Sequence, residues 1–433
     1  MTPAFVVAAP SSGSGKTLVT LGLLRAFRNA GLVAASAKIG PDYIDPRFHE
    51  AASGRPSVNL DGWAMSGERL LSLAAGAGQG ADILVVEGVM GLFDKAAEPG
   101  LGAGGAADVS KTIGAPVVLV IDASGLAQSA GAVAAGFRAF DPDVEIAGVI
   151  LNRVASARHA ELCRAGCAEA GVAVFGAVPR RAELKTPSRH LGLVQAGELD
   201  GLESFVAAAG EHVAAHVDLA ALRRAARPLT RAGSAPSATP VRPLGSRIAV
   251  AHDVAFRFTY PHLLDGWRAA GAEIAPFSPL ADEAPDASAD AVYLPGGYPE
   301  LHAGRLAAAA RFVSGMRDAA ERGAAVYGEC GGYMTLGHGL IDAEGARHAM
   351  LGLLPLETSF ETRRLHLGYR RAALAADGPL GSAGLDCRAH EFHYASIVRE
   401  GEAPPLFRLT DGSTAGLVAG TVAGSFLHLI DAS

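Results

Sequence analysis

Cysteine is scarce in this chain, with four residues among 433. So few thiols exclude a disulfide framework and fit a reducing compartment, so we expect a cytoplasmic protein. Cys163 and Cys167 lie four residues apart on a predicted helix, and no second pair lies near them. That spacing favours packing in a helical core over metal binding.

Positive charge and long apolar runs are also lacking. Lysine and arginine total 37 against 44 acidic residues, which gives a net charge of −7, and no basic run stands out. This balance argues against a nucleic-acid partner. The longest uncharged stretch, from Gly412 to Ile430, is interrupted by four glycines and predicts short strands, so we expect no membrane helix. The N-terminus has no basic region of the kind that opens a signal peptide.

A glycine-rich loop lies near the N-terminus. It follows an apolar run at residues 5–9 that predicts a buried strand, and it precedes helical spacing at residues 18–29. This context is that of a phosphate-binding loop, whose backbone N–H groups and helix N-terminus hold phosphates. Pro10 stands where the usual pattern has its first glycine, and the alternative is an ordinary Gly/Ser-rich turn. The predicted nucleotide-binding residues are Ser12, Gly13, Ser14, Gly15, Lys16 and Thr17.

Polar residues follow three β-branched runs in the first half. Glu87 follows residues 83–86, Asp122 follows residues 117–121, and Asn152 follows residues 146–151. Such runs predict parallel strands buried on both faces, and ligands bind at the carboxyl ends of these strands. The first half is therefore predicted to be an α/β domain with a parallel sheet and a ligand site at that edge.

Residues 228–246 are rich in proline, serine and alanine and predict a linker. We therefore expect an N-terminal synthetase domain at 1–227, the linker at 228–246 and a second α/β domain at 247–433. In the second domain, residues 248–251 and 291–294 predict strands.

Cys330 lies between glycines in the stretch 328–332. An apolar run at 324–327 precedes it and helix-compatible residues follow it. A nucleophile at such a strand-to-helix turn is typical of a nucleophile elbow, with the N–H of Gly331 facing a developing oxyanion. The alternative is a buried cysteine in a glycine-rich turn.

Three segments resemble the triad-type glutamine amidotransferases: residues 294–300, the Cys330 turn, and residues 424–428. The resemblance implies that Cys330 is the nucleophile and His428 its base. It further implies that the N–H groups of Gly331 and of Gly297 or Gly296 form the oxyanion hole. The family often carries an acid two residues after the histidine. Ile430 stands there in this chain, so the third member of a triad is missing or comes from elsewhere.

The first half resembles dethiobiotin-synthetase-like ligases. The whole chain resembles the cobyrinate or hydrogenobyrinate a,c-diamide synthases, in which the proline at the loop is ordinary. The segments that carry this resemblance are residues 9–17, 38–46, 59–61, 86–94, 255–260 and 390–394.

The resemblance implies an ATP-dependent amidation of two corrin carboxylates through acyl phosphates, with ammonia taken from glutamine. It implies Thr17, Asp42 and Glu87 as Mg²⁺ ligands and Asn152 at the adenine. Asp45 and Asp122 are then candidates for orienting the substrate.

The histidines of His390-Glu391-Phe392-His393 are three residues apart in a strand-like context, whereas a zincin helix needs them four apart, so metal binding is disfavoured.

The nearest alternative enzyme is a nickel-sirohydrochlorin a,c-diamide synthase. Cobyric acid synthase fits less well at residues 41–46. A P-loop switch that binds a protein partner is the alternative from another class, and it would not need Cys330 and His428. The sequence leaves open whether the corrin ring contains cobalt when it binds and which of the two carboxylates reacts first. It also leaves open the oligomeric state, for which a homodimer is one option.

Overall fold

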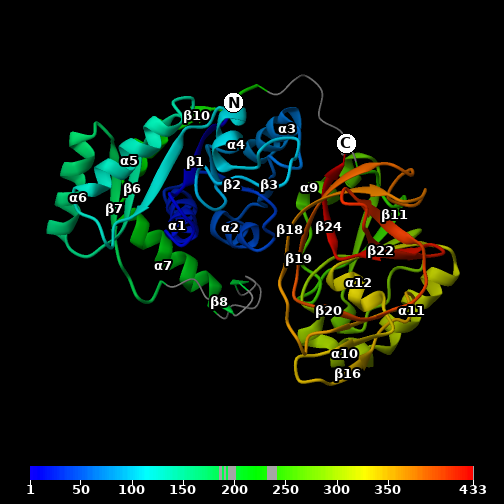
Figure 1. Cartoon of the computed structure of the whole chain (residues 1–433). Coiled ribbons are helices and arrows are strands. Elements are labelled where there is room, and N and C mark those ends of the chain that lie inside the picture. The colour runs from blue at the N-terminus through cyan, green and yellow to red at the C-terminus, as the bar shows by residue number, and fades with distance from the viewer. Residues whose placement is uncertain (185–187, 190–191, 194–200, 232–240, 433) are drawn as a thin grey trace. The chain divides into compact units, whose positions relative to one another are not determined.

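The computed structural model describes residues 1–184, 188–189, 192–193, 201–231 and 241–432. By its contacts the chain divides into two compact units, Met1–Ser237 and Ala238–Ser433. Each unit has its own sheet (Figure 1). We describe each unit by itself.

The N-terminal unit alternates strands and helices, as its sequence pattern predicts. Its strands are β1 (Pro3–Ala8), β2 (Ala34–Ile39), β3 (Val58–Leu60), β4 (Ile83–Glu87), β5 (Val117–Asp122), β6 (Ile146–Val154), β7 (Val174–Pro179), β8 (Ser188–Arg189), β9 (Gly192–Leu193) and β10 (Arg227–Pro228). Its helices are α1 (Lys16–Asn29), α2 (Asp45–Ser53), α3 (Gly67–Gly78), α4 (Ala106–Ile113), α5 (Ser129–Phe140), α6 (Ala157–Glu169), α7 (Leu202–Ala214) and α8 (Leu219–Ala225).

The strands of this unit form a parallel sheet in the order β3-β2-β4-β1-β5-β6-β7, and β10 pairs antiparallel with the start of β1. Strands β1 and β4 are buried almost throughout, which explains their continuous apolar runs. The register places Lys38 of β2 opposite Glu87 of β4, and Asp122 of β5 opposite Asn152 of β6. Polar residues from four strands therefore lie at or near the carboxyl ends of the strands, on the same side of the sheet.

Helix α1 leaves the phosphate loop and crosses α7 at close range. A Cβ on Gly22 would lie 2.3 Å from Val213, and one on Gly210 would lie 2.5 Å from the Arg25 side chain. Cys163 and Cys167 are buried on α6, as expected of core residues.

The C-terminal unit contains strands β11 (Arg247–Ala251), β12 (Glu273–Phe277), β13 (Ala291–Leu294), β14 (Ala325–Glu329), β15 (Gly339–Ile341), β16 (Arg347–Ala349), β17 (Leu356–Ser359), β18 (His366–Leu374), β19 (Asp386–His393), β20 (Ser396–Glu400), β21 (Pro405–Leu409), β22 (Thr414–Ala419), β23 (Val422–Ser425) and β24 (Leu427–Ala432). Its helices are α9 (Pro261–Ala269), α10 (Ala303–Ala308), α11 (Ala310–Glu321) and α12 (Gly331–Leu336), with 3-10 turns η2 (Pro279–Ala281) and η3 (Pro299–His302).

The main sheet of this unit runs β12-β11-β13-β14-β23-β22-β21-β18-β19-β24. Strands β12, β11, β13, β14 and β23 pair in parallel, and the remainder pair antiparallel. A smaller sheet has the order β16-β15-β17-β20. The mixed α/β class predicted for this half is therefore confirmed, and Gly412 to Ile430 forms strands β22 to β24 with their turns.

Both ends of the predicted linker pack against the rest of the protein. At the first end Pro228 lies in β10 and Leu229 is buried, and at the second end Val241 and Leu244 are buried. Residues 232–240 lie outside the described part of the chain. Among the described helices, none is long and apolar enough to cross a membrane.

Candidate active sites

The glycine-rich loop joins β1 to α1, as predicted. Gly13 (φ 80°) and Gly15 (φ 86°) adopt left-handed conformations that favour glycine, and α1 begins at Lys16. Asn152 braces the loop, because its Nδ2 donates to the Ser14 carbonyl at 2.9 Å. The approach is so close that a Cβ on Gly15 would lie 2.3 Å from Asn152 Nδ2. The loop therefore presents the N-terminus of a 14-residue helix, which is suited to phosphate.

Lys16 and Thr17 lie beside the end of β4. The Lys16 ammonium donates to the Met90 carbonyl, and Thr17 Oγ1 donates to Glu87 Oε1 at 2.8 Å. Burial, followed by the nearby Lys38 charge, lowers the pKa of Lys16. Ser12 and Gly13 are exposed at the tip of the loop.

A buried charge network surrounds Glu87. Lys38 Nζ lies 3.0 Å from Glu87 Oε1 and 2.6 Å from Asp45 Oδ2, and His49 Nε2 lies 2.6 Å from Glu87 Oε2. These side chains are at most 6% exposed. Buried charges persist when they are paired and hydrogen-bonded, as they are here.

The network fixes the ionisation of its members. Burial alone would raise the pKa of Glu87, but Lys38 and the hydrogen bond from His49 outweigh it and hold that pKa well below its usual value. Burial would lower the pKa of Lys38, but Asp45 and Glu87 raise it. Burial and the neighbouring Asp42 raise the pKa of Asp45 to about 7, although Lys38 opposes them. Glu87 is therefore the fixed anion and Lys38 the fixed cation of the network.

The remaining predicted residues of this unit lie in different surroundings. Asp42 Oδ1 accepts the N–H groups of Ile44 and Asp45, at 2.7 and 3.1 Å, so it caps the turn that leads into α2. Asp122 pairs with Arg153 at 2.5 Å and accepts the Ser124 N–H.

Asn152 also lines a cavity of about 670 Å³ with Gly15, Leu18, Pro179 and His212. A cavity of this size beside a phosphate loop can hold a nucleoside.

Cys330 occupies a strained turn between β14 and α12. Its φ of 45° and ψ of −99° are unusual for a residue that carries a side chain, and the residue is 3% exposed. Its N–H donates to the Ser425 carbonyl of β23 at 2.8 Å, and its Sγ lies 3.7 Å from the Phe392 carbonyl of β19. The strand, turn and helix predicted around Cys330 are thus present.

Glycines bring the other predicted residues to this turn. A Cβ on Gly331 would lie 2.9 Å from the Gly297 nitrogen, and one on Gly296 would lie 2.2 Å from His428 Cε1. The backbone of Gly297 therefore lies close to Gly331, the residue after Cys330.

Burial favours the neutral forms of both Cys330 and His428. It raises the pKa of the Cys330 thiol well above its usual value, with a further contribution from the Glu300 charge. It also lowers the pKa of His428 well below its usual value, helped by His390 and His393. Both shifts therefore favour a neutral thiol and a neutral imidazole.

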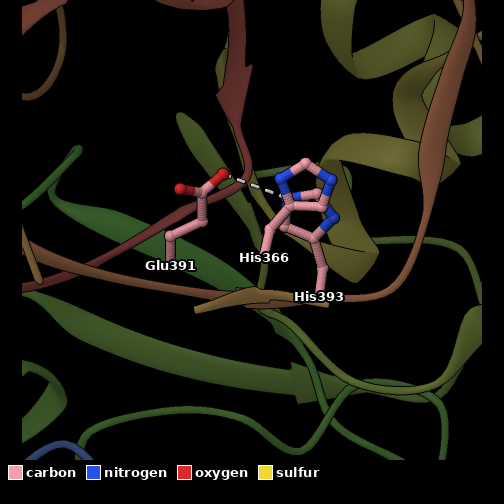
Figure 2. A group of neighbouring side chains, drawn as sticks. All are labelled: His366, Glu391 and His393. Carbon is pink, nitrogen blue, oxygen red and sulfur yellow. Dashed lines mark hydrogen bonds and ion pairs between the residues drawn. The ribbon is translucent and has the colours of Figure 1, made fainter. Parts of the chain in front are cut away.

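Figure 2 shows a second group of side chains, His366 of β18 with Glu391 and His393 of β19. Their ligand atoms lie within 4.8 Å of one another. Glu391 accepts from His393 at 3.1 Å and pairs with Arg370 at 2.7 Å, and the His393 ring stacks on Phe426 at 3.8 Å. Glu391 therefore has a positively charged partner in Arg370.

Sequence reasoning missed Lys38, His49, Glu329 and His366. Lys38 and Glu329 each stand in or next to an apolar run that predicts a buried strand. A charged side chain is rarely buried unless it is paired, so these two positions could have been recognised as candidates from the sequence. His49 and His366 enter their groups only through tertiary packing, which the sequence does not display.

The fold and the two sites define a two-part protein, a P-loop nucleotide-binding unit with a cysteine-containing amidotransferase unit. Residues 5–194 match the model of the CobQ/CobB/MinD/ParA nucleotide binding domain, and residues 247–433 match that of the CobB/CobQ-like glutamine amidotransferase domain.

Relatives match nearly the whole chain. A hydrogenobyrinate a,c-diamide synthase of a Sinorhizobium species is 54% identical over 98% of this chain and 98% of its own. Another, of Rhodobacter capsulatus, is 55% identical over 98% of each chain. A solved glutamine amidotransferase structure is 18% identical over 42% of this chain and 89% of its own, with a TM-score of 0.31.

The chain belongs to the hydrogenobyrinate a,c-diamide synthase family. The predicted family and the predicted class, a glutamine-hydrolysing amide-forming ligase with a nucleotide-binding unit, are confirmed at this level. Because the relatives span both units, the alternative of a P-loop switch without an amidotransferase is wrong.

Proposed function

We propose that this chain amidates the a and c side-chain carboxylates of hydrogenobyrinate or cobyrinate, using ATP and ammonia released from glutamine. The observation that carries the proposal is the pairing, in one chain, of a phosphate loop beside Glu87 with a thiol at a strained elbow. The names of the full-length relatives support the choice of macrocycle.

In the N-terminal unit the substrate carboxylate attacks the γ-phosphorus of ATP, and ADP leaves. The resulting acyl phosphate is attacked by ammonia at its carbonyl carbon, and phosphate leaves with the electron pair of the broken C–O bond. Lys16 and the N–H groups of the loop and of the first turn of α1 stabilise charge on the transferring phosphoryl group. Asn152, at the cavity beside Gly15, contacts the adenine.

The oxygen ligands of this site fit Mg²⁺. Thr17 Oγ1 and Glu87 Oε1 lie 2.8 Å apart, and Asp42 carries a further carboxylate in the turn before α2. Hard oxygen donors of this kind suit Mg²⁺. Thr17 and Glu87, with Asp42, would hold the ion, which supplies charge neutralisation at the phosphates. Asp45 and Asp122 then orient the ring substrate.

In the C-terminal unit Cys330 Sγ attacks the amide carbon of glutamine. His428 takes the thiol proton and passes it to the leaving ammonia. The N–H groups of Gly297 and Gly331 stabilise the oxyanion. Water then hydrolyses the thioester and releases glutamate. The ammonia must stay unprotonated until it meets the acyl phosphate, so a path sheltered from water is required.

Replacing His428 by alanine tests the base. We expect His428→Ala to lower glutamine-dependent synthesis by about 10²–10⁴-fold, the usual contribution of a general base. Synthesis from ammonium salts should persist. Steady-state rates with each nitrogen source measure the split. If this variant hydrolysed glutamine at the wild-type rate, another histidine would be the base, and His393 is the next candidate.

The identity of the ring is tested by supplying hydrogenobyrinate, cobyrinate or nickel-sirohydrochlorin with ATP and glutamine. Liquid chromatography of the products distinguishes mono- from diamide. Conversion of nickel-sirohydrochlorin alone would replace the proposed function by that of the nearest alternative enzyme.

One phosphate loop must serve two carboxylates, so the ring has to turn between the two reactions. We expect a free monoamide early in a time course. Asp45→Asn should raise the apparent KM for the ring or change the ratio of monoamide to diamide more than it changes ATP binding. A monoamide that never appears free would mean that the ring is not released. A change in ATP binding alone would place Asp45 in the nucleotide site.

A further inference from the structure

The chain lacks an acid at the place where the histidine of a triad usually has one. Ile430, two residues after His428, is a buried aliphatic side chain. Asp431 lies opposite Arg388 in the β19–β24 register, and its carboxylate accepts the Ala432 N–H at 3.1 Å. No acid thus stands on this segment at the place where a triad usually has one.

A carboxylate reaches the ring from another strand. Glu329 Oε2 lies 3.8 Å from His428 Nδ1, and the two side chains are 2% and 0% exposed. Glu329 is the last residue of β14 and directly precedes Cys330. It therefore lies beside both proposed reactive residues.

Three donors hold Glu329 in place. The hydroxyl of Tyr293 donates to Oε2 at 2.7 Å, and the hydroxyl of Tyr327 donates to Oε1 at 3.1 Å. The N–H of Leu429, the residue after His428, donates to Oε1 at 3.1 Å. The two tyrosine rings are stacked, with centroids 5.8 Å apart. The carboxylate is thus fixed from β13, from β14 and from the strand that carries His428.

We propose that Glu329 is the positioning residue of this site: it orients His428 and stabilises the imidazolium that forms when His428 takes the Cys330 proton. The proposal rests on the roles proposed above for Cys330 and His428. A positive charge that appears in a buried site is costly unless a negative charge lies close to it. At 3.8 Å the contact is electrostatic and longer than a hydrogen bond, and such contacts often tighten when substrate binds.

The protonation of Glu329 gives the proposal a second observable. Burial raises its pKa to about 7, although Tyr293, the Leu429 N–H and Tyr327 oppose the shift. The ionisable groups around it are Tyr293 on β13, Tyr327 and Cys330 on either side of it along the chain, and His428 on β24. The carboxylate is charged above that pKa and neutral below it. Glutaminase activity should therefore fall as the pH drops through about 7, and this decline should be missing in a Glu329→Gln variant.

The test compares Glu329→Gln with Glu329→Asp in the full chain. Gln keeps the shape and can still accept the Leu429 N–H, whereas Asp keeps the charge. We expect Gln to lower kcat for glutamine by about 10–100-fold with little change in KM, less than the loss of the base itself. Asp should retain more activity than Gln. A Gln variant as active as wild type, or more active than Asp, would overturn the proposal.

Controls separate this proposal from the function on which it rests. Ammonia-driven synthesis should stay intact in both variants, and Glu357→Gln, at another buried carboxylate of this unit, should leave glutaminase unchanged. If Cys330→Ala abolishes glutaminase and His428→Ala lowers it, while Glu329→Gln keeps the wild-type rate, only the role of Glu329 fails. If Cys330→Ala keeps glutaminase, the proposed function fails. Thermal unfolding checks that the variants fold. If the Gln variant does not fold, the pH profile of the unaltered chain decides, and a glutaminase rate that does not fall as the pH drops through about 7 would contradict the proposal.

Discussion

Cys330→Ala should abolish glutamine-dependent synthesis and leave ammonia-dependent synthesis near the wild-type rate. The thiol is the nucleophile of the proposed amide hydrolysis, and alanine removes it while adding no bulk at a residue that is 3% exposed. The phosphate loop belongs to the other unit and keeps Lys16, Thr17 and Glu87. The loss with glutamine should be complete within detection, because no other group of this site can form the thioester.

The measurement is diamide formation with glutamine and with an ammonium salt, followed by liquid chromatography. Cys387→Ala is a matched control, since Cys387 is a second buried thiol of the same unit. It should keep both activities. An equal loss of the two activities in Cys330→Ala would argue against separate glutaminase and synthetase sites.

Lys16→Ala and Glu87→Gln should lose synthesis with either nitrogen source. In the proposed mechanism Lys16 stabilises charge on the transferring phosphoryl group. Glu87 is the anion around which Thr17, Lys38 and His49 are arranged. Positioning and charge neutralisation supply nearly all of the catalysis in phosphoryl transfer. Removing Glu87 also leaves the buried Lys38 with fewer counter-charges, so we expect lower stability of this variant as well.

Single-turnover formation of ADP in the presence of the ring substrate isolates this step from ammonia supply. Lys111→Ala removes a lysine of the same unit whose partners are Asp108 and Asp141, and it should form ADP at the wild-type rate. Unchanged ADP formation in Lys16→Ala would mean that the first unit is not the synthetase. Glutaminase measured alone should survive in both site variants.

The sequence predicted the elements that carry the sites because their signals are local. The apolar run before the phosphate loop is β1, and the glycine-flanked Cys330 is the turn between β14 and α12. Glu87 ends β4 and Asp122 ends β5, whereas β6 continues past Asn152 to Val154. In each case a few consecutive residues contain both the strand and the polar residue or thiol that goes with it.

The partners of those residues could not be predicted, because they come from strands distant along the chain. Lys38 reaches Glu87 through the pairing of β2 with β4. Glu329 of β14 lies near His428 of β24, although these two strands are not neighbours in the sheet. Neither contact has a local signature. The roles assigned to Asp42 and Asp122 stay predictions, since the structure shows one capping a turn and the other paired with Arg153.

The backbone at Cys330 has a consequence for how this position can vary. A positive φ at a residue with a side chain costs on the order of 1–3 kcal/mol, and glycine would remove most of that cost. For the free energy of folding alone, glycine would be more favourable than cysteine at position 330. A Cys330→Gly substitution would therefore make the unit more stable but remove the proposed nucleophile. Selection for the reaction must therefore hold the cysteine there against the preference of the fold, so that this position is a point where stability and activity are in direct opposition.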